Sequence, residues 1–556
     1  MSNKRSFHRK VAYFSAIALL LLPLSWLSAP SISSRAAPDG QAKLGGKLAQ
    51  LRSTYKLSQT NLGEIDPASE TIRLATLGLR GIAVNLLWGK AIEYKKTENW
   101  TEFSSTLEQI TKLQPNFISV WKFQGWNLSY NLSVEFDDFN DRYYWVMRGI
   151  NFLKDGVNYN EDSADLTADV GWFIGQKIGR ADEKKQYRRL FKADDDFHGE
   201  REQRDRDNWL VAREWYKEAE DAAVRANTIK RPTGKGRSEL LFYSAAPMTR
   251  MSYATAIEND GQFGGAGGIA QQAWRNAGLE WEEYGDRSIL HSSGTTIRLS
   301  DQDRHEADAE RYLAELEALA PGTREKIAQE RREFLSPIEK EALDTPGIDR
   351  TSEQRDLASA ARSIISVSHE EVADRIGEEF PEKARQAART ARSATESEGL
   401  GIFVSRYKGI VNYDHWAMRA RTEQTLDAIN ARTKLYAGDR AREQALLEDA
   451  KESYEEGLAL WRKVTDANPE LLDDALTGDD LLDIIWFYRG ILGELDEEFP
   501  VDFPLWEIME RHDLDQRFAD LVEMRDSTLK DNPAVPPVQE SPSSSPSQDE
   551  PEGEIQ

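Results

Sequence analysis

Apolar residues recur at helical intervals along the first part of the chain. Between residues 77 and 94, the apolar positions that share this spacing are Leu77, Val84, Leu87, Trp88, Ala91 and Tyr94. Steps of three, four and seven residues return to one side of a helix, so this segment predicts an amphipathic helix. The spacing continues from Phe103 to Ile110 and ends before Pro115, which cannot donate a helical hydrogen bond. Strand-like alternation and hairpin turn dipeptides are scarce, and the chain therefore predicts an all-α fold.

A second pattern returns at a longer interval. Trp121 begins the run Trp-x2-Gln-Gly-x2-Leu, and its glycine position returns in the run Val-Gly-x2-Ile that begins at Val170. The two glycines, Gly125 and Gly171, are 46 residues apart. Small and bulky apolar residues alternate at a related spacing in three further places, which are Gly149, Leu153 and Gly156; Ala212, Tyr216 and Ala219; and Gly457, Trp461 and Val464 before Pro469. Glycine lets two helices approach closely, and the bulky residue opposite fills the groove.

These runs resemble the tetratricopeptide (TPR) repeat, a helix pair of about 34 residues whose first helix carries Trp-x2-Leu-Gly-x2-Tyr. The segment LGLRGIAVNLLW at residues 77–88, with LQPNF after it, is also similar to the start of uncharacterised exported bacterial TPR-like proteins. The resemblance covers residues 85–180, and more weakly 200–225 and 425–470. It implies an α-solenoid and no known reaction. The 46-residue interval then corresponds to one repeat plus an insertion at the acidic segment 134–140.

The N-terminal segment predicts export. Lys4, Arg5, Arg9 and Lys10 precede an apolar run at residues 11–27. This order is typical of a secretory signal, and the run is shorter than the roughly 20 residues that a spanning helix needs. Two alternatives stay open: cleavage after Ala36, or an uncleaved anchor that contacts the membrane through residues 11–27. Both alternatives predict that the protein is exported. It is then either periplasmic or otherwise extracytoplasmic, or it is anchored to the membrane by its N-terminus.

Composition narrows the range of functions. The chain has 96 acidic and 71 basic residues and a formal charge of −25, which argues against a nucleic acid partner. It has no cysteine, so disulfides, thiolate zinc sites and cysteine nucleophiles are excluded. Its 15 Trp, 18 Tyr and 20 Phe residues need a core, which excludes a wholly disordered acidic chain.

The patterns divide the chain into five parts. We expect a signal or anchor at 1–38, a TPR-like domain at 39–290, a charged helical region at 291–400, a second TPR-like domain at 401–530, and an acidic tail at 531–556. In the charged region, a short heptad seam from Ala309 to Leu319 favours a local helical hairpin over a dimeric coiled coil. The tail is rich in Pro and Ser and has no basic residue, which predicts disorder.

Candidate chemistry is sparse. Asp414 and His415 form the most suggestive acid–base pair, but neighbouring residues on a helix point about 100° apart, so we expect no catalytic site there. The acidic clusters at 137–141, 194–196 and 473–480 lack the spacing of a calcium loop. The glycine-rich segment 261–268 lacks the Gly-Lys-Ser/Thr ending of a phosphate loop. We therefore expect no catalytic, cofactor-binding or metal-binding residue and no cofactor.

Three functions fit these observations. The first is an exported or membrane-anchored helical-repeat scaffold that binds a protein partner in the cell envelope without catalysis. The second is a secreted helical-toroid enzyme that acts on polysaccharide, because tryptophan and tyrosine can stack on sugar rings. The third is a self-assembling envelope coat component. The repeat signatures favour the scaffold, and the helical spacing of the aromatic residues predicts that they belong to the core.

Overall fold

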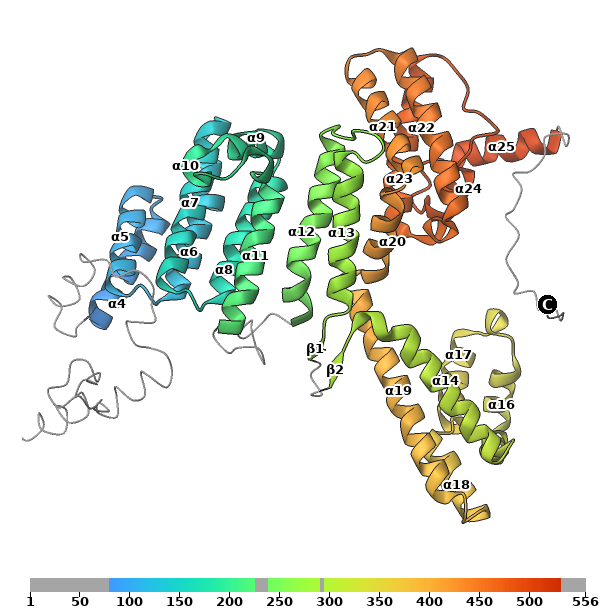
Figure 1. Ribbon diagram of the computed structural model, residues 1–556. Coiled ribbons are helices and arrows are strands. Elements are labelled where there is room, and N and C mark those ends of the chain that lie inside the picture. Colours follow the sequence, from blue (N-terminus) through green and yellow to red (C-terminus); the bar gives the residue numbers. More distant parts are fainter. Residues whose placement is uncertain (1–79, 226–238, 291–294, 532–556) are drawn as a thin grey trace, which may run out of the picture. The chain divides into compact units, whose positions relative to one another are not determined.

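Helices form nearly all the regular structure of the computed structural model, which describes residues 80–225, 239–290 and 295–531. The all-α prediction is confirmed for this part of the chain. The expected signal or anchor at 1–38 and the expected tail beyond Asp531 lie outside the described residues. The chain divides into two compact units, Met1–Thr249 and Arg250–Gln556, and each is described separately (Figure 1).

The first unit contains helix pairs. Its elements are α4 (Arg80–Lys96), α5 (Trp100–Leu113), α6 (Ile118–Trp126), the π-helical turn η2 (Asn127–Leu132), η3 (Ser133–Glu135), α7 (Phe139–Tyr159), α8 (Ala164–Phe173), the π-helical turn η4 (Ile174–Ile178), α9 (Lys184–Ala193), α10 (Asp195–His198), η5 (Gln203–Asp205), α11 (Asn208–Arg225) and the start of α12 (Glu239–Asn259). Helix α4 packs on α5, α6 packs on α7, and α8 packs on α11. The short helices α9 and α10 are inserted within the third pair.

The predicted apolar stripe of the first pair is confirmed. Val84 and Ala91 of α4 are buried together with Phe103, Leu107 and Ile110 of α5. Helix α5 ends at Leu113, as the following proline requires. Leu77, the first residue of the predicted stripe, lies outside the described residues.

Glycines bring α6 and α7 into close contact. A β-carbon at Gly125 of α6 would lie 2.6 Å from Cγ of Leu153 of α7. In the opposite direction, a β-carbon at Gly156 of α7 would lie 2.7 Å from the Trp121 ring of α6. Each helix therefore offers a glycine to a bulky side chain of the other. The packing that the sequence pattern predicted at these four residues is present.

The expected insertion at 134–140 is corrected by the structure. Only residues 136–138 separate η3 from α7, so that segment contributes little irregular chain. Helical turns run without interruption from Ile118 to Glu135, and α7 extends over Phe139–Tyr159. The 46-residue interval therefore arises from long helical segments and not from one loop.

The second unit is also helical. Its elements are the end of α12, α13 (Ile269–Gly285), β1 (Ile289–Leu290), β2 (Thr296–Ile297), η6 (Leu299–Asp301), α14 (Gln302–Leu319), α15 (Thr323–Glu333), α16 (Pro337–Asp344), η7 (Gly347–Asp349), α17 (Ser352–Ile365), α18 (His369–Glu379), α19 (Ala384–Val411), α20 (Tyr413–Glu423), α21 (Leu426–Glu443), α22 (Leu447–Ala467), η8 (Pro469–Asp473), α23 (Ala475–Glu494), α24 (Trp506–His512) and α25 (Ala519–Asp531). The antiparallel ribbon pairs Ile289 with Ile297 and Leu290 with Thr296.

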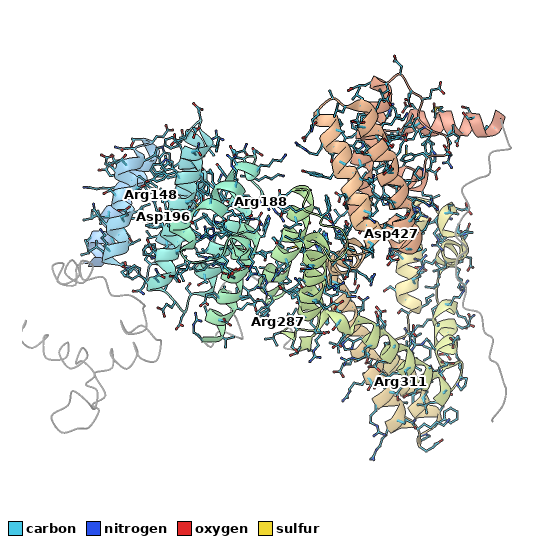
Figure 2. All side chains as sticks on the ribbon, turned by 45° about the horizontal axis from the view of Figure 1, so that its top comes forward. Arg148, Arg188, Asp196, Arg287, Arg311 and Asp427 are labelled. Atoms are coloured by element: carbon cyan, nitrogen blue, oxygen red, sulfur yellow. The ribbon has the colours of Figure 1, made fainter. Side chains whose placement is uncertain are left out.

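The charged region is larger than the expected hairpin. Helices α14 and α19 lie side by side, and four further helices, α15–α18, connect them (Figure 1). Leu316 of α14 is buried against α18 and α19, so the heptad seam packs against helices of the same chain. Arg311 of α14, labelled in Figure 2, pairs with Asp308 at 2.9 Å. Residue 400 lies inside α19, and the two compact units of the chain divide after Thr249.

Helices α21 and α22 repeat the glycine contact of the first unit. A β-carbon at Gly457 of α22 would lie 2.7 Å from Leu435 of α21, and one at Gly438 of α21 would lie 3.1 Å from Tyr454 of α22. The main core of the unit continues from this pair into α23 and α24. Among the described residues, no helix combines the length and the apolar character that crossing a bilayer requires.

Candidate functional site

An aromatic cluster reaches the surface of the first unit on α6, η2 and α8. The Trp126 and Tyr130 rings stack with centroids 4.2 Å apart and an angle of 11° between their planes. Trp172 stacks on Trp126 at 5.9 Å, and Phe173 packs edge-on against Tyr130 at 5.5 Å. Trp126 remains 45% exposed. Phe173 itself is buried, and we call the other three residues, Trp126, Tyr130 and Trp172, the aromatic surface.

The π-helical turns place this surface. Turn η2 follows the dipeptide Gly125-Trp126 directly, and η4 begins two residues after the equivalent tryptophan, Trp172. In a π-helical turn the backbone bonds span five residues, which widens the helix, and such turns occur frequently at functional sites. Helices α6 and α8, which α7 separates in the sequence, therefore present their tryptophans side by side, each next to a π-helical turn.

Charged groups border the aromatic surface. Lys122, one turn before Trp126, lies 2.8 Å from both Asp165 and Asp169 of α8. Burial lowers the pKa of Lys122, but the two carboxylates outweigh burial and raise it overall, so the ammonium stays charged. At the other end, Nζ of Lys177 lies 4.7 Å from the Tyr130 ring centroid. This arrangement allows a flat or cationic side chain of a partner to stack on Trp126. The charged groups beside the aromatic surface can hydrogen-bond to the edges of that side chain.

The aromatic residues thus divide into two groups. Trp121 is buried, and its Nε1 donates a 2.7 Å hydrogen bond to the carbonyl of Pro115. It belongs to the core, as the helical spacing predicted. Trp126 stacks on Trp172 and is 45% exposed, so the prediction that the aromatic residues belong to the core does not hold for Trp126. The signal available in the sequence was the repeated dipeptide Gly-Trp at 125–126 and 171–172.

A buried row of polar side chains lies on α20 in the second unit. We call His415, Arg419, Thr422 and Glu423 the polar row. His415 Nδ1 lies 2.8 Å from Asp474 Oδ1 at the start of α23, and the His415 side chain is 8% exposed. Asp414, the sequence neighbour of His415, points elsewhere and pairs with Lys408 at 2.8 Å.

The polar row continues into a network of buried charges. Glu423 is 2% exposed and accepts hydrogen bonds from Nε and Nη2 of Arg432, the shortest at 2.6 Å. Glu258 of α12 accepts a 2.7 Å hydrogen bond from Nε1 of Trp274. Burial and the nearby Glu423 charge raise the pKa of Glu258 to about 8, against the opposing effect of Arg432. The carboxyl of Glu258 therefore holds a proton at neutral pH.

This network contains an imidazole and carboxyl groups, the side chains that most often transfer protons in catalysis. Asp474 orients the His415 imidazole, and His415 Nε2 has no hydrogen-bond partner among the described residues. Arg419 Nε and Thr422 Oγ1 also lack one within that part of the chain. All these atoms are buried between helices, so they fit a role in joining α12, α13, α20, α21 and α23.

The acidic clusters mainly cap helices and pair with arginines. Asp138 accepts backbone hydrogen bonds at the start of α7, and Asp194 does so at the start of α10. Asp195 pairs with Arg206 at 2.5 Å, and Asp473 pairs with Arg511 at 2.6 Å. In the described ranges, no three His, Asp or Glu side chains converge as metal ligands. Segment 261–268 is the loop that precedes α13.

No family model matches this chain, and no curated protein matches it.

Proposed function

We propose that the protein is an exported or membrane-anchored TPR-like scaffold that binds a protein partner through the aromatic surface. The observation that carries this proposal is the exposed stack of Trp126 on Tyr130 and Trp172. Tryptophan, tyrosine and arginine dominate the binding energy of protein interfaces. An exposed and already stacked tryptophan loses little conformational freedom on binding.

The TPR-like interpretation is supported by the glycine contacts. The α6–α7 and α21–α22 pairs both exchange a glycine and a bulky residue in each direction. In the third pair of the first unit, a β-carbon at Gly171 would lie 2.9 Å from the carbonyl of Ala212 and 3.3 Å from the Tyr216 ring. Stacked helix pairs of this kind present continuous surfaces for extended partners.

Binding is favoured over polysaccharide hydrolysis by the charges beside the aromatic surface. Hydrolysis needs two carboxyl groups free to act on a sugar from opposite sides. The two carboxylates next to Trp126, Asp165 and Asp169, both contact the ammonium of Lys122. They are held in an ion pair on one side of the aromatic surface. A peptide that stacks on Trp126 needs no such pair.

Crosslinking in native cells, followed by mass spectrometry, tests this function. We expect crosslinks from the wild type to one specific protein, and their loss in Trp126→Ala. The matched control is Tyr144→Ala, since Tyr144 of α7 is also exposed, at 55%, and lies outside the aromatic surface. Equal crosslinking by all three proteins would contradict the proposal. Circular dichroism checks that both variants keep their helices.

A further inference from the structure

Helix α19 carries three exposed arginines on one face. Arg385, Arg389 and Arg392 are four and three residues apart, a spacing that aligns side chains along a helix. All three are solvent-exposed. We call them the arginine row.

The arginine row makes no ion pair with any carboxylate of the described residues. Its one hydrogen bond runs from Nε of Arg389 to the backbone carbonyl of Arg385 at 3.3 Å. Glu396 is four residues beyond Arg392, within reach on a helix, and still forms no ion pair with it.

Several other basic residues of the same region are paired. Their pairs are Lys326–Glu379, Arg331–Glu371, Arg332–Asp344 and Arg375–Glu330. In a chain with a formal charge of −25, most exposed arginines have an acidic neighbour available. Three unpaired guanidiniums on one face are therefore a local positive surface that fits an acidic segment.

The chain itself contains such a segment. Residues 532–556 include Glu540, Asp549, Glu550, Glu552 and Glu554 and no Lys or Arg. Four of these five acids fall within residues 549–554. This tail begins directly after α25, in the same compact unit as α19. Extended at about 3.5 Å per residue, the chain from 532 to 549 reaches roughly 60 Å.

We propose that the acidic end of the tail, residues 549–554, binds the arginine row of α19. Guanidinium and carboxylate groups form charge-assisted, often bidentate, hydrogen bonds. Covalent attachment gives the tail a high effective concentration, on the order of millimolar for a short linker. Exposed ion pairs are individually weak and are screened by dissolved ions, so the contact depends strongly on salt.

The absence of cysteine allows a direct distance measurement on the full chain. Ala388→Cys beside the arginine row and Gly553→Cys in the tail take a spin label each. We expect a short-distance population at low salt. It should disappear at about 0.5 M NaCl, where the Debye length falls to about 4 Å. It should also disappear in the triple variant Arg385→Glu/Arg389→Glu/Arg392→Glu.

Matched controls test whether the contact is specific to the arginine row. The pair Leu446→Cys and Gly553→Cys, with its first label at an exposed position on another part of the unit, should show no short population. The triple Arg→Gln variant removes charge without adding acids, and it should lose the short population as well. Circular dichroism checks that α19 persists in both triple variants.

Two results would overturn the proposal. One is a distance distribution at position 388 that salt and charge reversal leave unchanged. The other is binding of phosphatidylserine vesicles that requires the arginine row and is unaffected by neutralising the tail acids to Gln and Asn. That result would assign the arginine row to a membrane surface.

Discussion

Gly125 and Leu153 are in such close contact that a β-carbon on the glycine would lie 2.6 Å from Cγ of the leucine. The same relationship, with the helix order reversed, joins Gly457 of α22 to Leu435 of α21 at 2.7 Å. Two helix pairs far apart in the sequence therefore use one packing device. The contact sets how closely α6 approaches α7, directly beside Trp126 in the sequence.

Gly125→Ala should destabilise the protein. The added methyl group has no room, so Leu153 or the helix must shift, at a cost of about 1–3 kcal/mol. The control is Gly89→Ala on α4, because a β-carbon at Gly89 has nothing within 4 Å. This change should stabilise the helix by up to about 1 kcal/mol, since alanine is the better helix former. Urea denaturation measures both changes, and similar effects at the two glycines would argue against close packing at Gly125.

Asp474→Ala should destabilise the second unit far more than Asp414→Ala. Asp474 accepts a 2.8 Å hydrogen bond from the Thr477 backbone and also pairs with the buried His415. Burial works against the charged form, but these hydrogen bonds hold the pKa of Asp474 below its ordinary value. Losing the helix cap alone costs about 1 kcal/mol, and an unpaired buried imidazole adds about 1–3 kcal/mol.

Asp414 offers the matched comparison, because its side chain is 71% exposed in its ion pair with Lys408. Removing such an exposed partner costs about 0–1 kcal/mol. Thermal unfolding of the two variants gives the comparison. If Asp414→Ala were the more damaging change, the assignment of Asp474 as the partner of His415 would be wrong.

Stability should fall between about pH 4.5 and pH 8 because of Glu258. Its pKa is about 8 in the fold, against an ordinary value of 4.5, so across this window the folded state holds a proton that the unfolded chain has lost. Rising pH therefore favours unfolding, and the contribution levels off above pH 8. The groups that face Glu258 are Trp274, Glu423, Arg432 and Arg419.

Glu258→Gln removes this titration and can keep the hydrogen bond from Trp274 through its amide oxygen. The variant should gain stability relative to the wild type as pH rises, with the largest gain near pH 8. Denaturation curves at several pH values give the difference between the two proteins. A difference that stays constant from pH 5 to pH 8 would mean that Glu258 is charged in the fold.

The sequence alone predicted the helices and their closest contacts. Val84, Phe103 and Leu107 are buried because helical spacing is a local property that the chain displays directly. The contacts at Gly125 and Gly156 were also predictable, since a small residue facing a bulky one leaves a recognisable spacing. The β-ribbon at Ile289 and Ile297 was not, because two short strands give too few alternations to detect.

The polar row could not be predicted from the sequence, because its partners are far apart along the chain. His415 pairs with Asp474, a residue 59 positions away, and the local pattern around His415 offered only its neighbour Asp414, which helical geometry excludes as a partner. Glu258 lies on α12 and Glu423 on α20, two helices that are far apart in the sequence and bring these carboxyl groups close together in the fold. Only tertiary packing brings such groups together, so no local spacing marks them. The exposed stack on Trp126 depends on π-helical turns, which the spacing of α-helices does not reveal.

A photo-crosslinking amino acid at position 126 shows whether a protein partner contacts the aromatic surface there. A benzophenone side chain at residue 126 keeps an aromatic ring on the aromatic surface, and the same side chain at residue 144 samples another exposed site. After irradiation of native cells, we expect one strong crosslinked protein from position 126 and none of it from position 144. The same weak background from both positions would contradict this expectation.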